Sequence, residues 1–206
     1  MSKQRKLFIT GIGTDVGKTV ASAILAEALK ADYWKPVQAG SLGNTDSDVV
    51  RRIISNSVSV VHPESYRLTQ PMSPHAAAKI DGITIRLKDF KSPETQNTLI
   101  IEGAGGILVP LSDNKLVIDL IEKLKAEVVI IISNYLGSIN HSLLTIECAL
   151  NRKLAIAGII FNGEPNVASE EIILHYAKLR LLGRIQREQE VNREMVLKYA
   201  GQFGTI

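Results

Sequence analysis

The segment Gly11–Thr19 reads GIGTDVGKT, a glycine-rich sequence of the kind that binds nucleotide phosphates. Backbone N–H groups in such a turn face a phosphate, and the N-terminus of the following helix adds a favourable dipole. Lys18 is expected to neutralise the β- and γ-phosphates, and Thr19 to place its hydroxyl on Mg²⁺. The common pattern has glycine where Ile12 stands, so the spacing is irregular. The predicted nucleotide contacts are Gly13, Thr14, Asp15, Val16, Gly17, Lys18, Thr19 and Val20.

Glu102 ends the apolar run TLIIE and enters a glycine-rich segment. A carboxylate at the end of a strand beside a P-loop is where a metal-binding acid is expected, because Mg²⁺ takes one or two carboxylates together with waters and phosphate oxygens. The predicted turn Gly103–Gly106 lets a ligand approach the backbone, so we predict contacts to Gly103, Ala104 and Gly105. A surface glutamate next to a flexible loop is the alternative interpretation.

Lys35 and two aspartates form a third group of candidates. Lys35 lies in the second predicted strand, just before Pro36, where it would supply a fixed cation near the phosphates. An ordinary exposed lysine is the alternative. Asp46 and Asp48 lie in the polar segment that follows, and either is suited to cap a helix or to support Mg²⁺. The sequence pattern alone does not choose between the two aspartates.

These residues need a scaffold, and the chain alternates short apolar runs with helical stretches. Several runs are continuously apolar, which is typical of strands buried on both faces of a parallel sheet. We therefore predict an α/β, doubly wound fold, with one P-loop domain over residues 1–206, a mostly parallel twisted sheet and helices on both faces. Ligands bind beyond the carboxyl ends of such strands. The predicted strands are Leu7–Thr10, Tyr33–Val37, Thr98–Glu102, Val128–Ser133 and Ile156–Phe161, with a last short run at 180–185.

Helices are expected where apolar residues recur on one face. Between them, residues 57–95 hold four of the seven prolines and are expected to form loops with one short helix near Ser73–Ile80. The predicted helices are Gly17–Lys30, Asp46–Ser55, Lys115–Lys125, Ser138–Arg152, Ala168–Leu179 and Glu188–Ala200.

Composition excludes several classes of protein. The 206 residues are 45% hydrophobic and 22% charged, which is typical of a globular chain rather than a disordered one. The single cysteine, Cys148, excludes an internal disulfide and a cysteine-built zinc site. The net charge of +3 is too weak to indicate nucleic-acid binding. Neither a membrane span nor a signal peptide is apparent. We expect a cytoplasmic protein that binds neither nucleic acid nor membrane.

Seven motifs resemble dethiobiotin synthetases in their order and form, and the resemblance covers Leu7–Ile185. They are GIGTDVGKT, KPVQAG, NTDSD, SPHAAA, EGAGGILVPLSD, GSINHSLLT and AIAGIIFN. The irregular glycine spacing is also that family's form. The resemblance implies an ATP- and Mg²⁺-dependent ligase of biotin biosynthesis. Such an enzyme converts diaminopelargonic acid and CO2 to a carbamate, activates it as a carbamic–phosphoric anhydride, and closes the ring to dethiobiotin with release of ADP and phosphate.

The resemblance also implies catalytic and metal-binding roles. Lys35 matches the family's active-site lysine, which would act together with Lys18 on anionic groups. Thr19, Asp48 and Glu102 match the metal-binding group. Asp48 is preferred there because the family's acid usually follows a serine and starts a helix.

Further implied roles concern the adenine and the substrate. Asn162 matches the asparagine that reads the adenine edge. Ser138 and Asn140 match a helix start that holds the substrate carboxylate across a two-fold dimer interface, so the resemblance implies a homodimer. Gly105 and Lys35 complete the implied substrate contacts.

The chain departs from the family's usual pattern at Ala39, Gly163 and Gln186, where the family has a hydroxyl residue, an acid and a proline. Two other classes of nucleotide-binding protein are alternatives. A partition-type switch ATPase would carry its signature lysine where Gly13 stands. A related amide ligase would add a glutamine-hydrolysing domain with a catalytic cysteine, for which this chain has no room.

Overall fold

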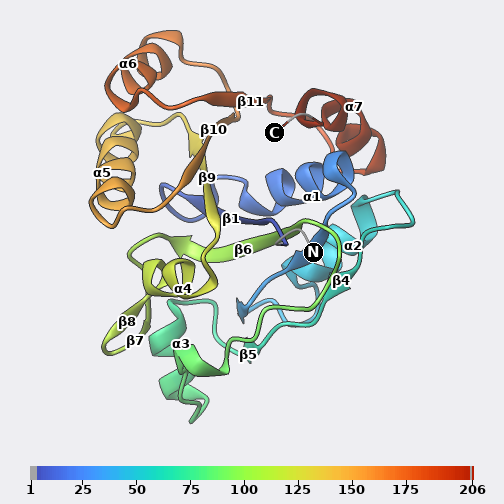
Figure 1. Cartoon of the computed structure of the whole chain (residues 1–206), viewed down its shortest axis with the longest axis vertical. Helices are drawn as coiled ribbons and strands as arrows, with labels where there is room; N and C mark the ends of the chain where they lie inside the picture. The colour runs from blue at the N-terminus through green and yellow to red at the C-terminus, as the bar shows by residue number, and fades with distance from the viewer. Residues whose placement is uncertain (1–3, 205) are drawn as a thin grey trace.

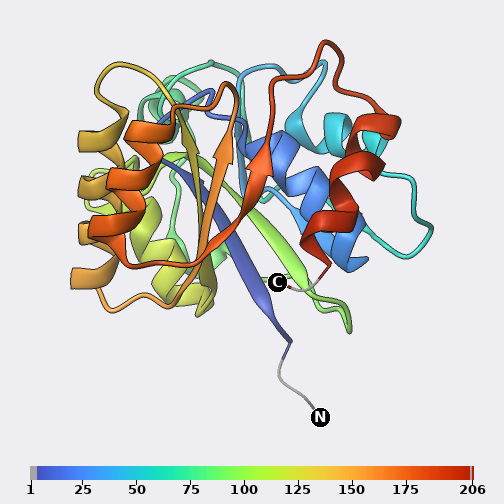
Figure 2. The same ribbon diagram turned by 90° about the horizontal axis from the view of Figure 1, so that it is seen from above.

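The computed structural model describes residues 4–204 and 206. A central β-sheet lies between two layers of helices (Figure 1). The view from above shows helices on both faces of the sheet (Figure 2). One face is covered by α4 (Val117–Leu124), α5 (Ser138–Asn151) and α6 (Val167–Ala177), and the other by α1 (Lys18–Leu29), α2 (Asp46–Ile53) and α7 (Arg193–Phe203).

The central sheet has seven parallel strands in the order β11-β10-β9-β1-β6-β2-β4. The chain builds the β6, β2 and β4 side of β1 first, and then crosses to the other side. This confirms the predicted doubly wound α/β fold, and it places the loop after β1 at the topological switch point. The strands are β1 (Lys6–Gly11), β2 (Asp32–Trp34), β4 (Val61–His62), β6 (Leu99–Gly106), β9 (Glu127–Ser133), β10 (Ile156–Asn162) and β11 (Leu181–Ile185).

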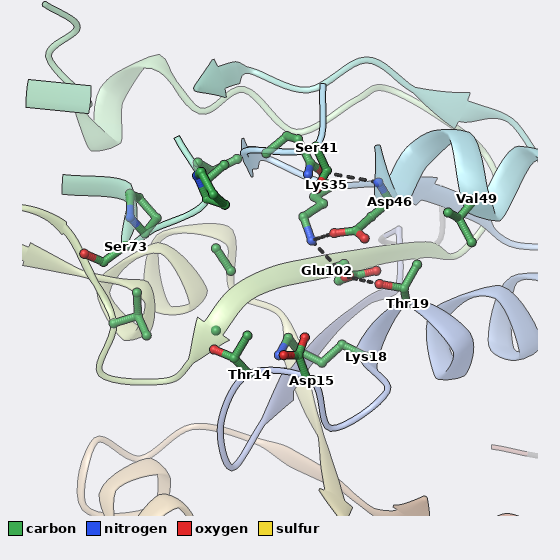
Figure 3. A pocket seen from close by; sticks show the side chains of 18 of the residues that line it. Thr14, Asp15, Lys18, Thr19, Lys35, Ser41, Asp46, Val49, Ser73 and Glu102 are labelled. Atoms are coloured by element: carbon green, nitrogen blue, oxygen red, sulfur yellow. Dashed lines mark hydrogen bonds and ion pairs between the residues drawn. The ribbon is translucent and has the colours of Figure 1, made fainter. Parts of the chain in front are cut away.

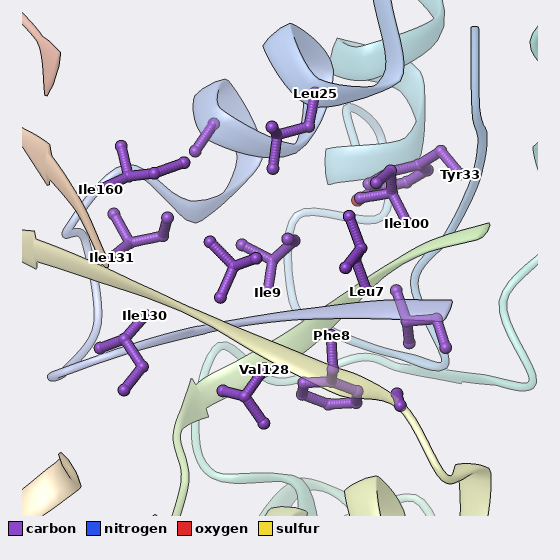
Figure 4. Packing of buried hydrophobic residues seen from close by; sticks show 14 of the residues in the cluster. Leu7, Phe8, Ile9, Leu25, Tyr33, Ile100, Val128, Ile130, Ile131 and Ile160 are labelled. Carbon is purple, nitrogen blue, oxygen red and sulfur yellow. The ribbon is translucent and has the colours of Figure 1, made fainter. Parts of the chain in front are cut away.

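The continuously apolar runs form the buried middle of this sheet. Successive side chains of a strand point to opposite faces. Leu7 and Ile9 of β1 therefore face α1, while Phe8 faces the opposite helix layer with Val128 (Figure 4). All four side chains are fully buried. A strand that is covered on both faces has no solvent-facing side, so apolar and polar residues do not alternate along these runs.

The predicted strand Tyr33–Val37 is wrong, because the chain changes sheets within it. β2 ends at Trp34, and β3 (Val37–Ala39) pairs with β5 (Tyr66–Leu68) in a separate two-stranded parallel sheet. Pro36 lies between the two strands and has no N–H to donate to a ladder. Lys35 therefore follows a strand instead of lying inside one.

The predicted turn at Gly103–Gly106 is also wrong, since β6 continues through these residues. Gly106 pairs with Gly11 of β1. A Cβ at Gly103 would lie 2.7 Å from the Phe8 ring, so the glycine allows the two strands to pack closely.

The remaining elements are short, and several bounds differ from expectation. The helix expected from Lys115 begins at Val117, after the hairpin of β7 (Pro110–Ser112) and β8 (Lys115–Leu116). The last helix begins at Arg193 rather than Glu188, because the Asn192 side chain caps it by accepting from the Met195 N–H at 3.0 Å. Residues 57–95 form β4, β5, the expected short helix α3 (Pro74–Ile80) and a 3-10 turn, η1 (Leu87–Asp89).

Candidate active site

The loop between β1 and α1 folds around the side chain of Lys18. The Lys18 Nζ donates to the Gly13 carbonyl at 2.8 Å, and the side chain is buried. Burial lowers the pKa of Lys18 from its ordinary value. No side chain caps the start of α1, so its first N–H groups are left for an anion.

Gly17 joins this loop to α1 in the left-handed region, with φ of 90°. A Cβ there would lie 2.1 Å from the Asn162 Nδ2, so the position requires glycine for both its conformation and its space. The Asn162 Nδ2 donates to the Val16 carbonyl at 3.0 Å. The carboxyl end of β10 is thereby fastened to the loop.

Glu102 is the buried centre of a hydrogen-bonded cluster (Figure 3). Its Oε1 accepts from the Thr19 hydroxyl at 2.9 Å and from the Lys35 Nζ at 2.9 Å. Its Oε2 accepts from the Tyr33 hydroxyl at 2.8 Å. Three residues, from α1, β2 and the segment after β2, therefore converge on one carboxylate of β6.

Lys35 lies between two carboxylates, those of Glu102 and Asp46, and is ion-paired with both. Burial opposes the charge on Lys35, but the attraction of the two carboxylates outweighs it and raises the pKa. Lys35 is therefore a buried, permanently charged ammonium at the carboxyl end of the sheet. The prediction of a fixed cation here agrees with this geometry.

The structure places Asp46, rather than the preferred Asp48, at this cluster. Thr45 caps α2, and Asp48 returns the bond in a capping box, with its Oδ2 accepting from the Thr45 N–H at 3.0 Å. The other oxygen of Asp48 pairs with Arg51 at 2.9 Å. Both oxygens of Asp48 are thus engaged away from Glu102, whereas Asp46 at the first helical position faces Lys35.

A cavity of about 810 Å³ opens above this cluster. The glycine-rich loop and the end of β6 form one wall. The segment from β3 through α3 forms the other, and includes apolar side chains such as Val37, Val49 and Met72. The cavity therefore has a charged, phosphate-sized end and a longer, partly apolar end.

Most of the predicted site residues line this cavity, and the others, apart from Asp48 in the capping box of α2, lie in three places. Gly13, Val16 and Asn162 lie in or beside the glycine-rich loop, while Gly103 is buried against Phe8. Ser138 and Asn140 lie at the start of α5, outside the cavity of this chain. The predicted residues in the lining are Thr14, Asp15, Gly17, Lys18, Thr19, Val20, Lys35, Glu102, Ala104 and Gly105.

Sequence reasoning assigned no role to several residues that complete the site. Tyr33 has no motif of its own, and its apolar neighbours indicate only a strand. Gln38 accepts from the Asp46 N–H at 3.3 Å and lies in the cavity wall. Ser73 and Pro74 belong to the SPHAAA motif, so that motif was the signal that could have identified them.

The parallel sheet, the glycine-rich loop at its switch point and the acid on the neighbouring strand define a P-loop nucleotide-binding protein. Solved structures share this fold. A plasmid partition protein of Borrelia burgdorferi B31 bound to AMPPNP has a TM-score of 0.61 at 14% identity, with 98% of this chain and 97% of that chain covered. The septum site-determining protein MinD of Pyrococcus horikoshii OT3, complexed with Mg-ADP, has a TM-score of 0.58 at 14% identity, covering 97% and 92%.

The sequence comparisons are more specific. The AAA domain family model matches residues 5–195. The chain is 50% identical to the ATP-dependent dethiobiotin synthetase BioD of Christiangramia forsetii, with 97% of this chain and 96% of that one covered. It is also 50% identical to the enzyme of that name from Cytophaga hutchinsonii, with 95% of each covered, and 41% identical to that of Chlamydia pneumoniae. The chain belongs to the ATP-dependent dethiobiotin synthetase family.

Proposed function

We propose that this chain converts diaminopelargonic acid, CO2 and ATP to dethiobiotin, ADP and phosphate. The observation that carries the proposal is the Lys35–Glu102–Thr19 cluster on the floor of the cavity it shares with the P-loop. Relatives named ATP-dependent dethiobiotin synthetase match this chain over nearly its whole length. The carbamate and the phosphates of the reaction are anionic, and Lys18 and Lys35 are fixed cations at one end of the cavity.

ATP is proposed to lie with its phosphates in the loop between β1 and α1. The uncapped N–H groups of α1 and the ammonium of Lys18 would hold the β- and γ-phosphates. Asn162, fastened to Val16, is proposed to read the adenine edge. Gly163 and Gln186 stand where the family usually has an acid and a proline. We therefore expect this chain to differ from its relatives most in how it discriminates between purine bases.

The donor set around Glu102 fits Mg²⁺, which prefers oxygen ligands and keeps several places for phosphate and water. Thr19 supplies a hydroxyl, and Glu102 and Asp46 supply carboxylates. We propose Asp46 in place of Asp48, because Asp48 is engaged in the capping box of α2. The metal supplies neutralisation of phosphate charge when it is bound.

The chemistry begins with attack of one substrate amine on CO2, which forms a C–N bond and releases a proton. The carbamate oxygen then takes the γ-phosphoryl group, and ADP leaves. The second amine attacks the carbamate carbon and expels phosphate, closing the cyclic urea. Lys35 is proposed to hold the carbamate and γ-phosphate charges together, since it is a buried permanent cation in the lining of the cavity.

The homodimer is proposed from the resemblance together with the surface of α5. Leu136 is fully exposed and Tyr135 exposed in the loop before α5, and Ile139 and Leu144 are exposed on α5 itself. Exposed apolar side chains gathered on one element are typical of an interface. In that dimer, Asn140 at the helix start would reach the substrate carboxylate of the second subunit.

The experiment that tests the function measures Mg²⁺-dependent ADP release with and without diaminopelargonic acid and bicarbonate. Release that needs both, with dethiobiotin formed in equal amount, is expected. ADP release that needs neither compound would support a nucleotide site but contradict the assigned ring closure.

Among the described residues, none of the helices has the length and apolar character that a membrane span needs. A cytoplasmic location stays a prediction.

A further inference from the structure

The hydroxyl of Tyr33 lies directly behind the central carboxylate of the site. It donates to the Glu102 Oε2 at 2.8 Å, whereas Oε1 receives Thr19 and Lys35. The two oxygens of Glu102 thus have different surroundings. One is held from inside the protein, and the other is presented to the groups that line the cavity.

The sheet register explains how a residue of β2 reaches this carboxylate. Tyr33 pairs with Ile100 of β6, and paired residues of parallel strands share a face. Glu102 is two residues further along β6, so it lies on that same face. The Tyr33 ring extends from the level of Ile100 toward Glu102, and Figure 4 shows Tyr33 beside Ile100.

A phenylalanine ring would fill this space equally well, so the hydroxyl of Tyr33 has to be explained separately. Tyr33 is fully buried, and a buried phenol without a partner is costly. Burial, together with the charge of Glu102, holds the pKa of Tyr33 well above its usual range. The phenol is thus kept as a donor, and its partner is Glu102.

We propose that Tyr33 is a positioning residue, which fixes the Glu102 carboxylate so that Oε1 faces the metal and phosphate end of the cavity. The proposal rests on the proposed magnesium site. Without the phenol, Oε2 would lose its partner, and the carboxylate would be held through Oε1 alone. The affinity for Mg²⁺ would then fall even though no metal-facing group has been changed.

The test is Tyr33→Phe, which removes one oxygen and keeps the ring. Calorimetry measures the binding of a non-hydrolysable ATP analogue with and without Mg²⁺. In the unchanged protein, Mg²⁺ should strengthen analogue binding. In Tyr33→Phe we expect this gain in affinity to be smaller by a factor on the order of ten, the loss typical of groups that orient a metal ligand. Analogue binding without Mg²⁺ is expected to stay the same.

Tyr66→Phe is the matched control, because it also removes a phenol that donates to a carboxylate, that of Asp89 at 2.9 Å, away from the cavity lining. It should leave the effect of Mg²⁺ unchanged. If Tyr33→Phe yields too little folded protein, Tyr33→Met serves instead, since methionine fills irregular gaps. A lower melting temperature with an unchanged effect of Mg²⁺ would overturn the proposal.

This binding assay also separates the two proposals. It contains neither diaminopelargonic acid nor bicarbonate, so it tests Tyr33 even if the assigned ring closure fails. A second measurement combines Tyr33→Phe with Glu102→Gln. If Tyr33 acts through Glu102, the double variant should bind the analogue with Mg²⁺ no more weakly than Glu102→Gln alone. Additive losses would show that Tyr33 acts elsewhere.

Discussion

Lys35 is the residue on which the anionic chemistry depends most directly. Lys35→Gln removes the charge that lies between Glu102 and Asp46 and keeps a polar side chain of similar reach. We expect turnover to fall by about 10²–10³, as when one preorganised stabilising donor is lost. ADP release at saturating substrate measures the effect.

The lysine substitution needs a check on folding, because it leaves a buried carboxylate without its cation. Glu102 keeps its bonds from Thr19 and Tyr33, so the variant should still unfold cooperatively. Lys91→Gln changes an exposed lysine and is expected to alter neither turnover nor melting. Near-normal turnover of Lys35→Gln would remove the proposed role.

Asp46 and Asp48 lie two positions apart in α2, and their substitution should give opposite results. Asp46→Asn is expected to raise the Mg²⁺ concentration for half-maximal turnover by at least about tenfold, a loss typical even of groups that only orient a metal ligand. Asp48→Asn should leave that concentration unchanged and lower the melting temperature, because the capping box of α2 loses its charge. The reverse result would return Asp48 to the metal site.

The sequence could not decide between these aspartates for a physical reason. Both lie in the first turn of α2, and either suits a helix start or a metal. Only the placement of Thr45 as the N-cap decides the matter, since it directs Asp48 back onto the loop and Asp46 toward Lys35. Lys35 and Glu102 could be picked out as candidates, because Lys35 interrupts the strand-forming run YWKPV and Glu102 closes the apolar run TLIIE.

At the scale of elements, Asp32 fastens the edge strand β4 to the sheet. Its Oδ1 accepts from the Val60 N–H at 3.0 Å and from Asn97 at 2.9 Å, while its Oδ2 contacts the His62 Nε2 at 2.9 Å. Burial would raise the pKa of Asp32, but these hydrogen bonds outweigh burial and lower it. We expect Asp32→Asn to reduce the free energy of unfolding by about 1–3 kcal/mol at neutral pH.

The pH dependence of this effect has a definite sign. The pKa of Asp32 is lower in the folded protein than in the unfolded chain, so its stabilisation is present above about pH 4. It is lost as the pH falls through the folded value. Urea unfolding at pH 7 and at lower pH should therefore show the unchanged protein and Asp32→Asn converging in acid. A constant difference would contradict the assignment.

The central strands and long helices were predictable because their burial demands continuous apolar runs or one apolar face. The two- and three-residue strands were not. β4 and β5 are too short to show a period, and their prolines and polar neighbours indicate loops. The break after Trp34 was missed because YWKPV has strand-forming residues on both sides of Pro36, and only tertiary pairing shows that they belong to different sheets.

At the scale of the whole molecule, the proposed dimer makes a prediction about Leu136. This side chain is fully exposed in the loop before α5. Leu136→Asp should shift sedimentation from dimer to monomer and reduce ring closure, because a buried carboxylate is costly at an interface. Val58→Asp, at an exposed position in the loop before β4, should change neither. A monomeric unchanged protein would contradict the dimer.

The two walls of the cavity come from different parts of the chain, and this division has a consequence for how the enzyme can change. Phosphate-binding groups are built on β1, α1 and β6 in the rigid middle of the sheet. The opposite wall comes from residues 37–49 and 71–74, which flank the small two-stranded sheet of β3 and β5. Replacement of the residues of that wall, with Asp46 kept, is therefore a route to new diamine substrates that leaves the phosphate- and metal-binding groups intact.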